Sequence, residues 1–253
     1  MEFNKIAAKD PRTVARDISG IFDSIFPQLT SGVVGHLNRK AIQLSNCEVV
    51  SEELVLASNL GKAMLFEVAF ARGEQLISGI TTADWDACLT TAIERQRRYF
   101  DAQLPEKLLD VDKEIADLVA SNLVKMLEKI KSSSGNNELI RSPKIPGYQW
   151  VASGVGDFSV GTKLIEVKCT NKRFSASDYR QIVMYWLLSY LSAIEKGTPE
   201  WTTGILINPR LNYLLEVPFN VIIAVAGAGR SKIEILEIFS SMVGEDTLRM
   251  MIK

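Results

Sequence analysis

Residues 156–168 constrain the fold of this chain more than any other stretch of its sequence. They read Gly-Asp-Phe-Ser-Val-Gly-Thr-Lys-Leu-Ile-Glu-Val-Lys, with apolar segments on either side of Gly161 and Thr162. Glycine at the first position of a two-residue loop suits a type II′ hairpin turn, because that position needs a positive φ angle. The sequence therefore predicts antiparallel strands joined by this turn, with Asp157 directly opposite Glu166.

Two acidic side chains and a lysine are expected to converge on one face of this hairpin. Opposite residues on neighbouring strands have Cβ atoms about 4.5–5.5 Å apart, so Asp157 and Glu166 repel each other unless a cation lies between them. Lys168 follows Glu166 by two residues and emerges on the same face, whereas Ile165 and Val167 face the core. This pattern favours a divalent-metal site with a lysine beside it. The alternative is a surface hairpin whose charged side chains are merely solvated.

The same residues resemble the signature of the PD-(D/E)xK nuclease superfamily, in which an Asp on one strand precedes Glu/Asp-x-Lys on the next. Here the matching residues are Asp157 and Glu166–Val167–Lys168, with Gly156 in place of the family's Pro. Gln181 and Tyr185 match the Gln-x-x-x-Tyr element of the RecB-like branch. Their spacing of four places both on one face of a helix. The resemblance covers roughly residues 105–220.

This resemblance implies an α/β fold of the restriction-endonuclease type, a mixed sheet flanked by helices, and a Mg²⁺-dependent nuclease that acts on DNA. It implies that Asp157, Glu166 and the carbonyl of Val167 hold the cation, for which Mn²⁺ would substitute. Lys168 would orient the attacking water or stabilise the phosphorus centre. Gln181 and Tyr185, which count among the candidate catalytic residues, would steer the DNA backbone or support the metal ligands.

Other candidate site residues lie on either side of the motif. Glu114 flanks the apolar stripe of a helix expected at residues 106–131, so it is a candidate further metal ligand; an exposed position at the helix rim is the alternative. Arg173, Tyr179 and Arg180 follow the motif and are candidate contacts for DNA phosphates, although ordinary surface positions are the favoured interpretation. The arginines within residues 95–98 could touch phosphate or simply end a helix.

Composition limits the classes of protein that remain. The 253 residues are 47% hydrophobic, and the formal net charge of −1 argues against a protein that coats DNA by charge alone. No apolar run reaches the length of a membrane span, and the start of the chain lacks a signal-peptide pattern. Three scattered cysteines indicate a reducing compartment, hence a cytoplasmic protein, and are too few for a four-cysteine iron–sulfur cluster in one chain.

The chain is predicted to have two parts. Residues 1–104 read as a helical N-terminal region, which could set specificity, regulate activity or bind a partner protein, and residues 105–253 read as the nuclease-like domain; an oligomer is possible. Helices are expected at 11–29, 32–44, 51–72, 82–100, 106–131, 175–195 and 231–243. Strands are expected at 138–144, 149–160, 163–170, 202–208 and 212–218.

Two other functions fit the same residues. One is a restriction-type endonuclease or defence enzyme that cuts foreign DNA, which would differ from an end-dependent nuclease in cutting closed circles. The other is a non-catalytic subunit that uses the nuclease scaffold to bind nucleic acid or protein. The complete set of Asp157, Glu166 and Lys168 argues against lost activity.

Overall fold

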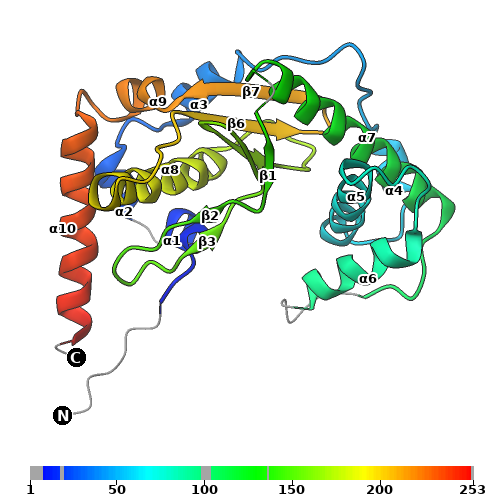
Figure 1. Cartoon of the computed structure of the whole chain (residues 1–253), viewed down its shortest axis with the longest axis horizontal. Coiled ribbons are helices and arrows are strands. Elements are labelled where there is room, and N and C mark those ends of the chain that lie inside the picture. Colours follow the sequence, from blue (N-terminus) through cyan, green and yellow to red (C-terminus); the bar gives the residue numbers. More distant parts are fainter. Residues whose placement is uncertain (1–7, 18–19, 98–103, 136, 252–253) are drawn as a thin grey trace.

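The computed structural model describes residues 8–17, 20–97, 104–135 and 137–251, and in that part of the chain it is a mixed α/β protein (Figure 1). The helices are α1 (Pro11–Asp17), α2 (Ile21–Ile25), α3 (Ser31–Asn38), α4 (Glu52–Leu56), α5 (Lys62–Ile77), α6 (Trp85–Gln96), α7 (Asp110–Ser132), α8 (Ala176–Lys196), α9 (Phe219–Ala226) and α10 (Lys232–Met251). The strands are β1 (Leu139–Arg141), β2 (Lys144–Ile145), β3 (Gly154–Val155), β4 (Phe158–Val160), β5 (Lys163–Val167), β6 (Thr203–Asn208) and β7 (Tyr213–Pro218).

The central sheet has five strands in the order β1-β4-β5-β6-β7. The pairs β1–β4, β4–β5 and β6–β7 are antiparallel, whereas β5 and β6 are parallel. A parallel pair needs a long crossover connection, and α8 supplies it. The prediction of a mixed sheet flanked by helices is confirmed.

The predicted register of the β4–β5 hairpin is also confirmed. Val160 pairs with Lys163, and Phe158 pairs with Ile165. Gly161 has a φ angle of 55°, the left-handed conformation that the turn requires of it. The expected strand at residues 149–160 is interrupted instead: β3 pairs with β2 in a separate ribbon, and the chain bends at Asp157 before β4 begins.

Successive side chains of β5 point to opposite faces of the sheet and pack against different helices. Leu164 belongs to the apolar cluster that contains α8, whereas Ile165 and Val167 belong to the cluster formed with α7. Because side chains alternate along a strand, Glu166 shares the α8 face with Leu164. The sheet therefore lies between α8 and α7, and the acid of the motif points towards α8.

The N-terminal helices pack on both layers of the sheet domain. Helices α1, α2 and α3 contribute to the cluster around α8, while α5 and α6 pack with the first half of α7. Each of the three apolar clusters thus combines residues from both sides of residue 104. Figure 1 shows α10 at one end of the molecule and α5 and α6 at the other.

Several expected helices are shorter or divided. The helix expected at residues 11–29 is divided into α1 and α2 near Gly20, whose φ angle is 99°. The helix expected at 51–72 is divided into α4 and α5, and α9 was not predicted. Across the described residues, the structure has no helix with the length and apolar character needed to cross a membrane.

Candidate active site

Asp157 is fixed at the open end of the β4–β5 hairpin. It directly precedes β4, and its Oδ2 accepts a hydrogen bond of 2.7 Å from the backbone N–H of Val167, the last residue of β5. This bond closes the hairpin beyond its last ladder pair, Phe158 and Ile165. The half-buried carboxylate of Asp157 is therefore held beside Glu166, as the hairpin pattern predicts.

Glu166, Lys168 and two residues of α8 form one buried hydrogen-bonded network. Lys168 Nζ lies 2.9 Å from Glu166 Oε1 and also donates to Gln181 Oε1 at 2.9 Å. Gln181 Nε2 donates to Glu166 Oε1 at 2.5 Å and to the hydroxyl of Tyr185 at 3.1 Å. Glu166 is 4% exposed and Lys168 is 8% exposed, so solvent screens this ion pair little. The structure thus brings the predicted motif and the Gln-x-x-x-Tyr residues together.

One oxygen of this network has no hydrogen-bond partner among the described residues. Glu166 Oε2 is buried and accepts no hydrogen bond from the described residues. A buried polar atom without a partner is costly, typically by about 1–3 kcal/mol, so native proteins rarely keep one without a reason. Its neighbour Asp157 supplies another carboxylate, and Val167 lines the same cleft.

These residues fit a small, hard cation. Mg²⁺ is usually bound through one or two carboxylates, with water and substrate phosphate completing its shell, rather than by a cage of protein ligands. In the described part of the chain, no group of three or more His, Cys, Asp or Glu side chains forms a possible cage of metal ligands. The pair Asp157 and Glu166 matches the smaller number of carboxylates that Mg²⁺ needs.

Electrostatics make Asp157 sensitive to a cation. Burial and, next, the charge of Glu166 raise the pKa of Asp157 above its ordinary value, while the hydrogen bond from Val167 and the charges of Lys168 and Arg12 act in the opposite direction. A bound cation would favour the ionised form. Burial and the charge of Glu166 also raise the pKa of Tyr185, which keeps its phenol neutral.

The network opens into a cleft of about 670 Å³. Helix α1 and residues near the hairpin line one part of it, and α5 with Arg95 of α6 lines another. Besides the motif, the charged and aromatic lining residues are Arg12, Arg16, Lys62, Phe66, Glu67, Phe70, Glu74, Arg95 and Asp178. Sequence reasoning missed all of these except Arg95. The sequence signal that could have found these residues is helical spacing. Arg12 and Arg16 are four residues apart, as are Lys62 and Phe66, so each pair lies on one face of a helix.

Glu114 is not brought into this cleft. It is exposed on α7 and does not line the cleft, whereas Glu67 of α5 does. Of the arginines within residues 95–98, Arg95 lines the cleft and Arg97 is exposed; Arg98 lies outside the described residues. Arg95 forms ion pairs with Glu67 and Glu74 of α5 in the wall of the cleft, in addition to lying in the last turn of its own helix.

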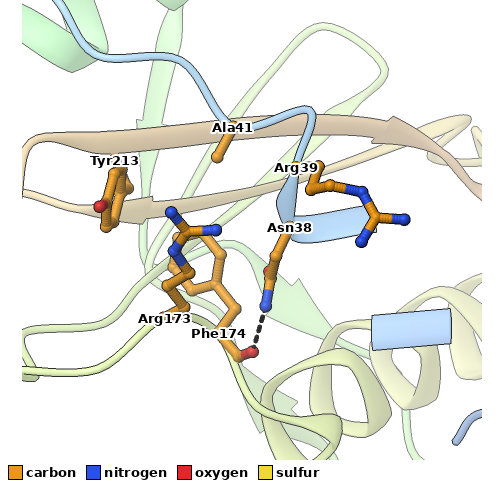
Figure 2. A pocket seen from close by; sticks show the side chains of 6 residues that line it. All are labelled: Asn38, Arg39, Ala41, Arg173, Phe174 and Tyr213. Carbon is orange, nitrogen blue, oxygen red and sulfur yellow. Dashed lines mark hydrogen bonds between the residues drawn. The ribbon is translucent and has the colours of Figure 1, made fainter. Parts of the chain in front are cut away.

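The three residues expected to grip flanking phosphates lie elsewhere. Tyr179 is buried and donates to Asn38 Oδ1 at 3.0 Å, and Arg180 pairs with Asp23 at 2.7 Å. Figure 2 shows Arg173 in a separate small pocket, where its guanidinium lies 5.5 Å from the centre of the Tyr213 ring. The first two therefore support packing between α8 and the N-terminal helices.

The fold and site define a class: a mixed α/β protein with an acid–acid–lysine group at the open end of a β-hairpin, inside a cleft. Comparison with family models, curated proteins and solved structures found no match to this chain.

Proposed function

We propose that this protein is a Mg²⁺-dependent nuclease that hydrolyses phosphodiester bonds of DNA. The observation that carries the proposal is the convergence of Asp157, Glu166 and Lys168 in one cleft, with Glu166 Oε2 buried and without a hydrogen-bond partner among the described residues. Two carboxylates beside a lysine suit an anionic substrate only when a cation offsets their charge. A phosphodiester with a metal ion meets this condition.

Asp157 and Glu166 would hold Mg²⁺, with the carbonyl of Val167 as a further proposed ligand. When bound, the ion would lower the pKa of a coordinated water and stabilise negative charge on the phosphate. Asp157 keeps Oδ2 in a hydrogen bond with Val167, so its orientation is set before any ligand enters. Such preorganisation avoids reorganisation during the reaction.

Lys168 is the proposed partner of the phosphate. Its ammonium is held by Glu166 and Gln181, each at 2.9 Å, so it presents a positive charge at a defined place in the cleft. From there it could orient a water or neutralise charge on a non-bridging oxygen. Gln181 is a positioning residue, because its amide connects the carboxylate and the ammonium and is itself fixed by Tyr185.

The sheet supports this proposal at the level of architecture. The antiparallel strands β1, β4 and β5 are followed by a helical crossover to β6, which pairs parallel to β5. The resemblance to the PD-(D/E)xK superfamily implies a mixed sheet flanked by helices of this kind. A restriction-type endonuclease is a variant of the same proposal. It would cut covalently closed circular DNA, whereas an end-dependent enzyme would leave circles intact.

One observation favours the non-catalytic alternative. Lys168 Nζ and Glu166 Oε1 already form an internal ion pair, which a purely structural site would also contain. Calorimetry with Mn²⁺ separates the two functions. The nuclease proposal requires a site in the wild type that is lost in Asp157→Asn, whereas the absence of any Mn²⁺ binding supports the scaffold.

The test of cleavage uses circular and linear DNA with Mg²⁺, and compares the wild type with Glu166→Gln and Lys168→Ala. The chain offers a matched control on the same strand: Lys163 pairs with Glu216 at 2.8 Å at the other end of β5. We expect Glu166→Gln and Lys168→Ala to abolish cleavage, and Lys163→Ala and Glu216→Gln to retain it. Turnover at the wild-type rate in Lys168→Ala would refute the assignment.

A further inference from the structure

Helix α1 forms a cationic rim on the cleft. Arg12 and Arg16 are four residues apart, both are exposed, and both line the cleft. Val14 and Ala15 anchor the helix in the apolar cluster around α8, and Arg16 Nε donates to the hydroxyl of Ser177 at 2.9 Å. Neither arginine forms an ion pair with another described residue. Their charge is therefore available to an external anion.

Helix α5 presents an aromatic stripe to the same cleft. Phe66 and Phe70 are one turn apart, and their rings meet edge-on at 5.8 Å between centroids. Phe70 packs on Phe158 of β4 at 5.6 Å, and the Arg95 guanidinium lies 5.5 Å from its ring centre. Phe70 is thus fixed by its neighbours. Phe66 is the half-buried aromatic ring that remains to meet a ligand.

One cation of the protein partly offsets the two acids of the α5 wall. Arg95 pairs with Glu74 at 2.7 Å and with Glu67 at 3.7 Å, and these side chains are all only partly exposed. This wall therefore repels a polyanion less than its acidic residues suggest. Arg12 and Arg16 of α1 add further positive charge to the lining of the same cleft.

Cationic side chains and an aromatic stripe lining one cleft are the combination that binds single-stranded nucleic acid. Basic residues track the phosphates, and unpaired bases stack on aromatic rings. In a duplex each base is already stacked and paired, so Phe66 could meet a base only after unstacking, which costs a few kcal/mol. The proposed reactive groups are also buried, with Glu166 only 4% exposed, so the scissile phosphate must enter the cleft.

We infer that the cleft binds a single strand of DNA, with phosphates on Arg12 and Arg16 of α1 and a base on Phe66 of α5. The inference rests on the proposed nuclease function for the choice of DNA as ligand. It adds a substrate class and names residues outside the metal site that select it. The strand runs between α1 and α5, which places its backbone beside Asp157 and Lys168.

The test measures binding in EDTA, where no cleavage occurs, by fluorescence anisotropy of a labelled oligonucleotide and of its duplex. We expect the single strand to bind at least tenfold more tightly than the duplex. The Arg12→Ala/Arg16→Ala variant should reduce the slope of log affinity against log salt by about 1.4, since each contact with a single strand contributes about 0.7. Phe66→Leu keeps an apolar side chain and should weaken single-strand binding about tenfold, leaving duplex binding unchanged.

The matched control is Arg39→Ala/Lys40→Ala, which removes two exposed cations at the end of α3, away from the residues that line the cleft. It should bind the single strand like the wild type. Equal affinity for the duplex, or an unchanged salt slope in Arg12→Ala/Arg16→Ala, overturns the inference. These outcomes are separate from the nuclease test: cleavage that depends on Glu166 but shows no preference for single strands refutes only the inference. Selective binding without any cleavage refutes only the nuclease proposal.

Discussion

Replacing Asp157 by Asn should stabilise the metal-free protein. The two carboxylates of the hairpin end repel each other, and burial raises the pKa of Asp157 further. Asn has nearly the same shape, and its side-chain oxygen can still accept the hydrogen bond from Val167 N–H. The substitution therefore removes a charge without opening a cavity or leaving a backbone donor unpaired.

The size of this effect follows from the geometry of the hairpin. Two charges about 5 Å apart interact by about 3 kcal/mol at an effective dielectric constant of about 20. Loss of the charge-assisted hydrogen bond from Val167 and of the attraction to Lys168 offsets about half of this gain. A net stabilisation of about 1–2 kcal/mol remains, which raises the melting temperature by about 2–8 °C in a protein of this size.

The dependence on pH tests the cause. In the unfolded chain Asp157 ionises near its ordinary pKa of about 3.9, whereas the folded protein holds its proton to higher pH. As pH rises above about 4, the unfolded state loses this proton first, so the wild type loses stability relative to Asp157→Asn. The difference should vanish near pH 3 and grow with rising pH until the folded carboxyl also ionises, at its raised pKa of about 8. Thermal unfolding in EDTA measures it, and an Asn variant less stable than the wild type at pH 7 would refute the reasoning.

Three other predictions follow from the same network. Lys168→Ala leaves the buried Glu166 carboxylate without its cation and should lower the free energy of unfolding by about 3 kcal/mol. Lys163→Ala removes one partner of a more exposed ion pair and should lower it by less than about 1 kcal/mol. Urea titration of the two variants measures both values. Mn²⁺ affinity measured by calorimetry should rise between about pH 6 and 8, because protons compete for Asp157; a flat profile would contradict the raised pKa. Tyr185→Phe removes the hydrogen bond that Gln181 donates to the phenol and should lower the free energy of unfolding by about 1 kcal/mol. The variant should retain Mn²⁺ binding, and loss of that binding would show that the phenol is a ligand.

The local parts of the site were predictable because they depend on near neighbours in sequence. The turn at Gly161 fixes the register of β4 against β5, and the register determines which residues meet across the hairpin. The spacing of Gln181 and Tyr185 on one helix needs only helical periodicity. The hydrogen bond from Gln181 to Glu166 then follows from the face of β5 that α8 covers.

The walls of the cleft were not predictable in this way. Nothing in the linear pattern places α1 or α5 beside a hairpin more than 60 residues later, because those contacts depend on how the apolar faces of several helices combine. Gly20 shows the same limit on a smaller scale. Its φ angle of 99° precedes the start of α2 inside a stretch with continuous helical periodicity.

The position of Glu114 has a packing explanation. The first half of α7, with Ile115 and Val119, packs against α5 and α6, and only the second half, with Leu123 and Met126, packs on the sheet. Glu114 belongs to the first half and is exposed there. Glu114 thus borders the apolar stripe of α7 in sequence but is exposed to solvent, on a part of the helix that packs on α5 and α6 rather than on the sheet.

Glu166 has an internal ion pair through one oxygen and, among the described residues, no partner for the other, and both features belong to one arrangement. Lys168 and Gln181 both bind Oε1, and this holds the carboxylate in one orientation with Oε2 turned away from them. A site that served stability alone would gain by satisfying both oxygens, since an unpartnered buried acceptor is a net cost. Proteins keep such costs where a ligand removes them. The same contacts that fix Lys168 therefore leave Oε2 without a partner among the described residues, and the proposed cation is a ligand that would satisfy it.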